Sequence, residues 1–440
     1  MLVVVLALLV ILLGTILIGT PVAFALGFSA VVLIILYMDP SQLMQIGSIA
    51  FSQSTSMNQL VAPLFILMAE ALAQGNIARD IFMVLSKWLR RINGGLALST
   101  MLASTVFAAL CGSSPATAAA MGRISIKEMK KRGYRQDFAA GVVAAGGTLG
   151  IMIPPSISLV IFGIITENSI AKLFMAGVLP GILISTLLCI FILFIVKIKP
   201  ELLGEDDRQK NEYKNEVTLN LEKITPVKDL LLITPPIILI FIVLGSLYSG
   251  ITTPTEAAGF GSIGALLIVI FSGRMSVNGF TGIMSATART SSMILFLIIG
   301  GMALSYVVSY LGIAQKISDL IVGSNLSPWM IMTLIYVLWF VLGCLMDPLS
   351  MIVLTVPFIY PTLLELGFNP LWLGIVSTLC VEIGMITPPV GLNLFVLKAI
   401  SDVPMGKIMA GAFPFVLVLV IGLIILSVFP QICLYLPSRM

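Results

Sequence analysis

Two short polar runs interrupt apolar sequence in this chain, and each places hydroxyl or carboxyl groups beside a proline. They are CGSSPAT at 111–117 and GCLMDPLS at 343–350. Serine and aspartate are favoured N-cap residues, and proline is favoured at the first helical position. Each run therefore predicts that one helix stops and another begins within a few residues, with Ser114 and Asp347 as the capping residues.

Two further runs combine paired prolines with glycine and polar side chains inside long apolar segments. They are GGTLGIMIPPS at 146–156 and GMITPPVGLN at 384–393. Adjacent prolines remove backbone donors and disfavour helix at the residue before them. Inside a membrane, unwound backbone is tolerated only where it is buried in protein or lines a cavity. Both runs therefore indicate broken helices around a binding site rather than simple kinks.

Such breaks provide two kinds of binding group. Helix N-termini carry partial positive charge and free N–H groups, which suit carboxylates, whereas helix C-termini, unwound carbonyls and hydroxyls suit Na⁺. The expected Na⁺ ligands lie at the breaks and are Ser113, Ser114, Thr117, Gly147, Gly150, Gly343, Asp347, Ser350, Gly384 and Thr387. The residues expected to contact the substrate are Ser114, Thr148, Ser156 and Asn393.

If a cation bound at these breaks drives transport, the ionisable residues favour Na⁺ over protons in that role. The chain has no histidine, so histidine proton relays are excluded. Asp347 is the clearest carboxylate within apolar sequence, and it is expected either to cap its helix or to hold a cation. For Glu70 and Glu382 the sequence leaves structural and functional roles equally open. Without histidine, an acidic cluster or a GxxxxGK[ST] motif, the chain is not expected to be an enzyme.

The elements that would position these residues are membrane-spanning helices. The chain has 440 residues, of which 59% are hydrophobic and only 10% are charged, whereas a soluble domain is about a quarter charged. Its apolar runs reach the ~20 residues needed to cross a bilayer. The run at 2–18 is expected to be a retained span, because no small-residue cleavage site follows it. We predict an all-α polytopic membrane protein, in contact with lipid and not with nucleic acid.

The two halves of the chain repeat each other. Three pairs of similar segments and one pair of prolines recur in the same order at offsets of 233 to 236 residues. The pairs are 77–81 with 313–317, Pro115 with Pro348, 150–155 with 384–389, and 175–180 with 409–414. Four matches at nearly one offset indicate an internal duplication.

The duplication predicts two repeats, each with about five spanning helices, one of them broken at its prolines, and one re-entrant helical hairpin. The expected boundaries are 1–196 for the first repeat (hairpin 94–130, broken helix 137–166), 197–228 for a cytoplasmic linker, and 229–440 for the second repeat (hairpin 328–366, broken helix 370–399). Amphipathic segments at 76–91 and 313–324 are expected to lie at the membrane surface and to brace a moving hairpin domain against a fixed scaffold.

The positive charges indicate that the repeats are inverted. An odd number of crossings per half places the halves in opposite orientations, and 21 of the 24 Lys and Arg residues then fall in predicted inner loops. These loops are 79–91, 123–135, 197–228, 274–289 and 398–407. This topology places the Pro115 hairpin on the inner side and the Pro348 hairpin on the outer side.

Together these motifs resemble the large membrane subunit (DctM-like, or M subunit) of TRAP transporters, which are tripartite ATP-independent periplasmic transporters. The likeness covers essentially the whole chain and is carried by 112–117, 150–156, 253–258 (TPTEAA), Asp347 with Pro357 and Pro361, and 387–391. The resemblance implies Na⁺-driven uptake of an organic acid, such as a C4-dicarboxylate or sialic acid, by an elevator movement in the bacterial inner membrane. It also implies two partners, a small four-helix membrane subunit on a separate chain and a periplasmic substrate-binding protein.

One alternative stays open, namely a stand-alone Na⁺/carboxylate or Na⁺/H⁺ carrier of related architecture. Such a carrier would transport its substrate without either partner. Both readings require no cofactor other than Na⁺ as the coupling ion. Neither indicates which organic acid is carried.

Overall fold

The computed structural model of the chain describes residues 2–203, 226–323 and 326–440, and all regular elements in these ranges are helices. Eight of the described helices are long and apolar enough to span a membrane, and shorter apolar helices accompany them. The predicted all-α, multi-pass fold class is therefore confirmed. The predicted linker at 197–228 lies for the most part outside the described residues, and its side of the membrane stays a prediction.

The helices before the linker follow one another closely. They are α1 (Leu2–Leu17), α2 (Val22–Tyr37), α3 (Leu43–Thr55), α4 (Val61–Gln74), α5 (Ile77–Trp88), α6 (Gly95–Cys111), α7 (Ser114–Lys131), α8 (Gln136–Thr148), α9 (Ile157–Thr166) and α10 (Ile170–Ile198). Short 3₁₀ turns connect some of them, at η1 (Pro40–Gln42), η2 (Met57–Leu60), η3 (Leu149–Ile151) and η4 (Pro200–Leu203).

The helices after the linker repeat this order. They are α12 (Pro226–Tyr248), α13 (Pro254–Phe271), α14 (Val277–Tyr310), α15 (Ile313–Val322), α16 (Pro328–Leu345), α17 (Pro348–Glu365), α18 (Pro370–Met385), α19 (Leu392–Ile400), α20 (Met405–Val428), α21 (Gln431–Leu434) and the 3₁₀ turn η5 (Pro437–Arg439). The series α4–α10 and α14–α20 both run from a long helix through a short amphipathic helix, a helical hairpin and a helix in two pieces to a long helix with an internal proline, Pro180 or Pro414. This order supports the duplication, whereas the inversion of the repeats stays a prediction.

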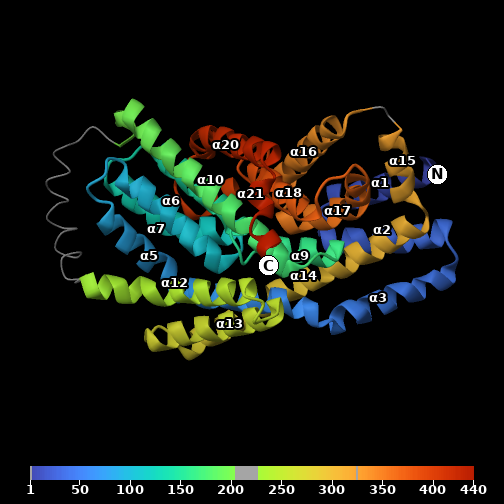
Figure 1. Cartoon of the computed structure of the whole chain (residues 1–440), viewed down its shortest axis with the longest axis horizontal. Coiled ribbons are helices and arrows are strands. Elements are labelled where there is room, and N and C mark those ends of the chain that lie inside the picture. Colours follow the sequence, from blue (N-terminus) through green and yellow to red (C-terminus); the bar gives the residue numbers. More distant parts are fainter. Residues whose placement is uncertain (1, 204–225, 324–325) are drawn as a thin grey trace.

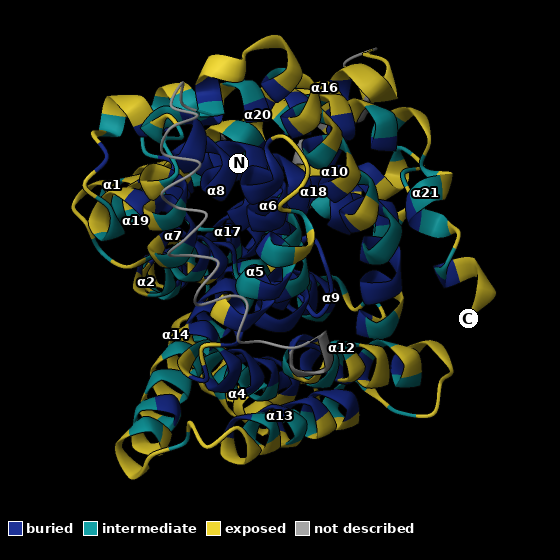
Figure 2. Cartoon of the chain, turned by 90° about the vertical axis from the view of Figure 1, so that its left-hand side faces the viewer, coloured by how far each residue is buried: buried dark blue, intermediate teal, exposed yellow. Residues whose placement is uncertain are grey.

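The helices form two groups. The frame group consists of α2, α4, α12, α13 and α14, which pack mainly on one another. The hairpin group consists of α6–α9 and α16–α20, in which α7 packs on α8, α16 on α18, α17 on α9 and α20 on α8. Figure 1 shows α12, α13 and α14 along one side of the molecule, and Figure 2 shows α4, α12, α13 and α14 together below the buried hairpin helices.

Local sequence sets the ends of several helices. The TPTEAA run forms a capping box at the start of α13, in which the Thr253 hydroxyl accepts from the Glu256 N–H at 3.3 Å and the Glu256 carboxylate accepts from the Thr253 N–H at 2.8 Å. Ser276 caps α14 by accepting from the N–H of Gly279 at 2.9 Å.

The predicted inner loop at 274–289 is wrong for most of its length, because α14 begins at Val277 and contains Arg289. Its 34 residues correspond to about 50 Å, more than the thickness of the hydrocarbon core. Part of α14 can therefore extend beyond the core, and Arg289, an exposed residue in its N-terminal half, is compatible with such a position.

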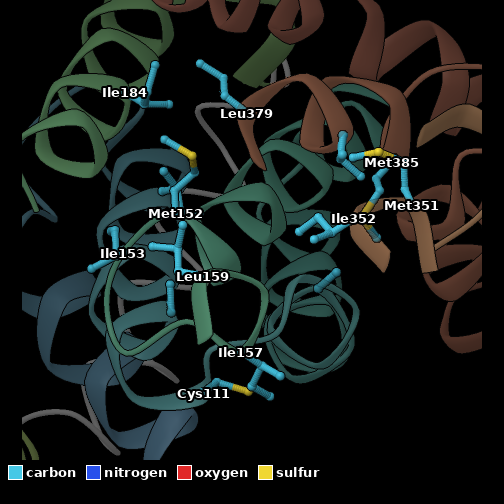
Figure 3. Packing of buried hydrophobic residues seen from close by; sticks show 14 of the residues in the cluster. Cys111, Met152, Ile153, Ile157, Leu159, Ile184, Met351, Ile352, Leu379 and Met385 are labelled. Carbon is cyan, nitrogen blue, oxygen red and sulfur yellow. The ribbon is translucent and has the colours of Figure 1, made fainter. Parts of the chain in front are cut away.

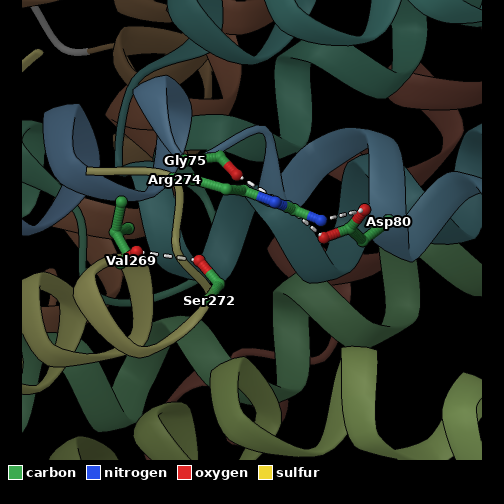
Figure 4. Close-up of polar contacts among 5 residues, drawn as sticks. All are labelled: Gly75, Asp80, Val269, Ser272 and Arg274. Carbon is green, nitrogen blue, oxygen red and sulfur yellow. Dashed lines mark hydrogen bonds and ion pairs between the residues drawn. The ribbon is translucent and has the colours of Figure 1, made fainter. Parts of the chain in front are cut away.

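Two ion pairs attach the amphipathic helix α5 to the frame group. Arg274, between α13 and α14, contacts the Asp80 carboxylate at 2.5 Å and donates to the Gly75 carbonyl at 2.8 Å (Figure 4). Lys87 contacts Asp229 of α12 at 2.6 Å. Both carboxylates are almost completely buried. Since α5 also packs on α6, it connects the frame group with the first hairpin.

The Asp80–Arg274 pair should contribute measurably to stability. We expect Asp80→Ala to lower the free energy of unfolding by about 1–3 kcal/mol, because the substitution leaves the partly exposed Arg274 guanidinium without its carboxylate. Denaturant titration followed by tryptophan fluorescence, in one detergent, would measure the change.

Glu128→Ala is the matched control for this substitution. The contact between Glu128 and Lys131 is 3.4 Å long and lies at the surface, so its loss should change stability by less than about 0.5 kcal/mol. Equal stability of the two variants would show that the Asp80–Arg274 pair does not hold α5.

Candidate functional site at the helix breaks

The first hairpin breaks where the sequence predicts it, between Cys111 and Ser114. Gly112 ends α6 in the left-handed conformation, with a φ of +61°, and extended Ser113 occupies the N-cap position of α7. The prediction that Ser114 is the N-cap is therefore wrong by one residue, because the first turn accommodates Pro115 at its second position as well. Ser114 is instead the first helical residue, and its hydroxyl donates to the carboxylate of Glu382 in α18.

The second hairpin breaks between Leu345 and Pro348, with Asp347 as the N-cap, as predicted. One oxygen of Asp347 accepts from the N–H groups of Leu349 and Ser350, both at 3.1 Å, and the other accepts from the Ser350 hydroxyl at 2.5 Å. The N-terminus of α17 therefore stabilises this carboxylate. The capping role alone explains why an aspartate is tolerated here.

The first broken helix is completely enclosed. The helical conformation ends with η3 and resumes at Ile157, and all residues between them are buried. Ser156 caps α9 by accepting from the N–H of Leu159 at 3.3 Å. Within the described part of the chain, the carbonyl oxygens of residues 152–155 accept no hydrogen bond. Unwound carbonyls in a buried position are the ligands expected for a cation.

The second broken helix is partly open. Between α18 and α19 the side chains of Pro388 and Pro389 are exposed, whereas the matching Pro154 and Pro155 are buried. Cis peptide bonds join both proline pairs. Gly391 precedes α19 in the left-handed conformation, with a φ of +62°, and its N–H donates to the carbonyl of Cys344 in the second hairpin at 3.0 Å.

Matched glycines bring each broken helix against the backbone of its own hairpin. A Cβ atom on Gly150 would lie 2.6 Å from the carbonyl oxygen of Ser113, and one on Gly384 would lie 2.5 Å from the carbonyl carbon of Gly343. Real Cβ atoms essentially never come so close to backbone. Both positions therefore need glycine, and the hairpin and the broken helix of each half meet at their breaks.

Contacts across the two halves bring all four breaks together. Ser114 of the first hairpin bonds to Glu382 of the second broken helix. A Cβ atom on Gly147 in α8 would lie 3.4 Å from the side-chain nitrogen of Asn393 in α19. Figure 3 shows apolar side chains around this region, including Met152 at the first break and Met385 at the second. The site therefore consists of polar groups from both halves in an apolar surrounding.

Two fully buried side chains at this site have polar atoms without a partner in the described part of the chain. They are Glu382, through its second carboxylate oxygen, and Asn393, through both its amide oxygen and its amide nitrogen. A buried polar atom without a hydrogen bond costs about 1–3 kcal/mol. Such atoms indicate a ligand, because a bound ion or substrate would complete their coordination. We call Ser114, Glu382 and Asn393 the break cluster.

Sequence reasoning found part of this cluster. It selected Ser114 and Asn393, but it singled out Asp347 as the clearest mid-membrane carboxylate and left the role of Glu382 open. In the structure Glu382 is fully buried within the protein, whereas Asp347 is partly exposed. The position of Glu382 two residues before the matched Gly384 is the signal that could have identified it.

The other expected ligands also lie at the breaks, and their assignment to Na⁺ or substrate stays a prediction. Thr117, Thr148 and Thr387 each donate to a backbone carbonyl three or four residues earlier, at 2.9, 2.6 and 2.6 Å. These bonds use the hydroxyl hydrogen and leave lone pairs on the oxygen for a cation. No group of three His, Cys, Asp or Glu residues that could hold a metal occurs in the described ranges. The ligands at the breaks are mostly neutral oxygens, which suit Na⁺ better than a transition metal.

Comparison with known sequences gives a consistent match over nearly the whole chain. The family model described as "Tripartite ATP-independent periplasmic transporter, DctM component" matches residues 9–432. The C4-dicarboxylate TRAP transporter large permease protein DctM of Pseudomonas aeruginosa is 35% identical over 415 residues, covering 94% of each chain. The sialic acid TRAP transporter large permease protein SiaM of Vibrio cholerae is 30% identical and covers 97% of this chain and 96% of its own.

A third relative is longer than this chain. The isethionate TRAP transporter permease protein DctMQ of Oleidesulfovibrio alaskensis is 31% identical over 95% of this chain, which corresponds to 64% of the relative. Among solved structures, the YdaH transporter of Alcanivorax borkumensis has a similar fold, with a TM-score of 0.61 over 89% of each chain at 14% identity.

The contact between Gly150 and Ser113 predicts a sharp steric limit. We expect Gly150→Ala to lower the free energy of unfolding by about 1–3 kcal/mol and to abolish transport, because the added methyl group meets rigid backbone rather than a flexible side chain. Gly245→Ala in α12 is the matched control, since a Cβ atom there has no neighbour within 4 Å. That control should be neutral or slightly stabilising. Normal transport by Gly150→Ala would contradict the observed packing of the break against the hairpin.

Proposed function

Because the chain belongs to the DctM family of tripartite ATP-independent periplasmic (TRAP) transporter components, we propose that it imports an organic anion together with Na⁺. The chain is a TRAP large permease, a multi-pass membrane transporter and not an enzyme. The membrane in which it works is proposed to be the bacterial inner membrane. The break cluster is the observation that carries the proposal.

The break cluster supports a site for both an anion and a cation. The Glu382 carboxylate lies fully buried, has Ser114 as its hydrogen-bond donor and leaves one oxygen unpaired, so a nearby cation would offset its charge. The Asn393 amide has both a donor and an acceptor available for a substrate. An enclosed site with both chemistries suits coupled binding of an anion and Na⁺.

We assign Na⁺ to the oxygen atoms at the breaks in each half. In the first half the ligands are drawn from Ser113, Ser114, Thr117, Gly147 and Gly150, and in the second half from Gly343, Asp347, Ser350, Gly384 and Thr387. The free carbonyls of residues 152–155 and the carboxylate of Glu382 are additional candidates. The substrate is assigned to Ser114, Thr148, Ser156 and Asn393.

The substrate is proposed to be an organic acid, because the names of several relatives specify an acid. Those names include a C4-dicarboxylate, sialic acid and isethionate, which share a negatively charged acid group. The N-termini of α7, α9, α17 and α19 lie at the breaks and would attract such a group through their partial positive charge.

The movement is proposed to be an elevator, in which the hairpin group slides against the frame group. Two features support it. The two groups pack mainly within themselves, as a mobile body and a fixed body must. The two breaks also differ in exposure, since Pro388 and Pro389 are exposed whereas the matching residues of the first break are buried. A transport site that is open to only one side of the membrane at a time is expected to have one exposed and one buried break.

The two proposed partners are a periplasmic substrate-binding protein and a small four-helix membrane subunit. A tripartite transporter of this family has such additional components. In the DctMQ relative the permease is part of a longer protein, and here we propose a separate small subunit. The exposed apolar side chains of the frame group, such as Phe241 and Phe271, would lie against lipid or this subunit.

Reconstitution is the experiment that tests the proposed function. We expect proteoliposomes that contain the chain and its small subunit to accumulate substrate only when the loaded binding protein is outside and a Na⁺ gradient is directed inward. Substrate uptake by the chain alone, at a similar rate, would support the stand-alone carrier instead. Uptake that follows a proton gradient and ignores Na⁺ would contradict Na⁺ coupling.

Asp347→Asn separates the capping role of Asp347 from the proposed role of its charge. Asparagine is as good an N-cap as aspartate, so stability should change by less than about 0.5 kcal/mol. If Asp347 contributes charge to a Na⁺ site, the Na⁺ concentration for half-maximal uptake should rise roughly tenfold or more. Asp39→Asn is the matched control, because Asp39 also caps a helical turn, by accepting from the N–H of Ser41 at 2.9 Å, but lies on an exposed turn. An unchanged Na⁺ dependence in Asp347→Asn would exclude a contribution of the Asp347 charge to Na⁺ binding.

A further inference from the structure

A basic hollow opens where the end of α5 meets the start of α12, on the predicted inner side of the membrane. It has a volume of about 280 Å³ and is lined by Lys87, Trp88, Arg90, Arg91 and Asp229. This size is just below the roughly 300–1,000 Å³ of pockets that hold drug-sized ligands, so it fits a compact chemical group. The hollow is separate from the helix breaks and has no part in the proposed transport site.

The charges around the hollow favour an anion. Three basic side chains line it against a single carboxylate, that of Asp229, which already forms an ion pair with Lys87 at 2.6 Å. Arg90 and Arg91 lie in the turn that follows α5, are exposed, and form no ion pair with any described residue. Arginine binds phosphate in a bidentate manner, which makes a phosphate group the best match for two adjacent free guanidinium groups.

An apolar surface borders the same hollow. Trp88 lines it with half of its surface exposed, and tryptophan is enriched at the boundary between lipid and water. On α12, Leu230 and Leu231 directly follow Asp229 and are 57% and 66% exposed. Neither leucine lines the hollow itself, but both provide exposed apolar surface on the same turn of α12 as Asp229.

We propose that this hollow binds the phosphate headgroup of an anionic phospholipid from the inner leaflet, with Arg90 and Arg91 as the phosphate ligands and Trp88, Leu230 and Leu231 against the lipid chains. A free phosphate ion would use the arginines but gain nothing from the apolar side chains. Basic pockets between membrane helices on the cytoplasmic side bind anionic headgroups elsewhere by the same physics.

A lipid at this position would touch α12 of the frame group and α5, the helix that connects the frame group with the first hairpin. The hollow lies between α12 of the frame group and α5, which packs on α6 of the first hairpin. Figure 1 shows α5 lying beside α12. The headgroup would therefore add a third connection between α5 and the frame, beside the ion pairs of Asp80 and Lys87.

Binding of short-chain lipids to the purified full-length chain tests the proposal, with native mass spectrometry as the readout. Dioctanoyl phosphatidylglycerol should bind the wild type at least tenfold more tightly than dioctanoyl phosphatidylcholine. The double variant R90Q/R91Q should bind phosphatidylglycerol roughly 10- to 30-fold more weakly. Because both arginines are exposed, the variant should retain the thermal unfolding midpoint of the wild type.

The matched control is K127Q/K130Q, which removes two exposed charges from α7 on the same predicted inner side but away from the hollow. It should bind phosphatidylglycerol within twofold of the wild type. Equal binding by R90Q/R91Q and the wild type, or an equal loss in both double variants, would overturn the proposed site. Displacement of phosphatidylglycerol by inorganic phosphate at equal concentration would also overturn it, since the hollow would then be a site for small anions.

Discussion

Every break in a membrane helix leaves backbone groups without partners. This structure tolerates four breaks because each hairpin break packs against the break in a broken helix. The first hairpin lies against the first broken helix at Gly150, and the second hairpin accepts the Gly391 N–H through Cys344. Water is absent at this depth, so only protein or a bound ligand can satisfy what remains. The position of the site follows from this constraint, because unpaired polar atoms of Glu382 and Asn393 and the free carbonyls of residues 152–155 lie where the breaks meet.

The sequence predicted those features that depend on neighbouring residues. Proline pairs and glycines act on their own backbone, so the breaks near Pro115, Pro154, Pro348 and Pro388 are confirmed. The N-cap role of Asp347 is confirmed for the same reason, whereas two adjacent serines made the first cap ambiguous by one residue. Contacts between distant residues were not predictable. Ser114 and Glu382 are 268 residues apart, and no local pattern relates them.

The two halves share a plan but differ in chemistry and in attachment. The first hairpin tip presents a serine to a buried glutamate, whereas the second presents a carboxylate that its own helix already stabilises. Ion pairs fix α5 to the frame group, whereas Ser318 of α15 donates to Glu365 of the second hairpin at 2.5 Å. The side-chain polar contacts of the surface helix therefore reach the frame in one half and the hairpin in the other. The duplicated halves therefore differ chemically at their hairpin tips and in the polar contacts of their surface helices.

The attachment of α5 also bears on how the protein is made. Asp80 and Arg274 are 194 residues apart, and Lys87 and Asp229 are 142 apart. At a synthesis rate of about 5–20 residues per second, Asp80 is synthesised roughly 10–40 s before Arg274. During this interval Asp80 lacks its native partner Arg274, so α5 cannot reach its final environment. The native contacts of α5 are therefore completed only after α12 and the residues up to Arg274 have been made.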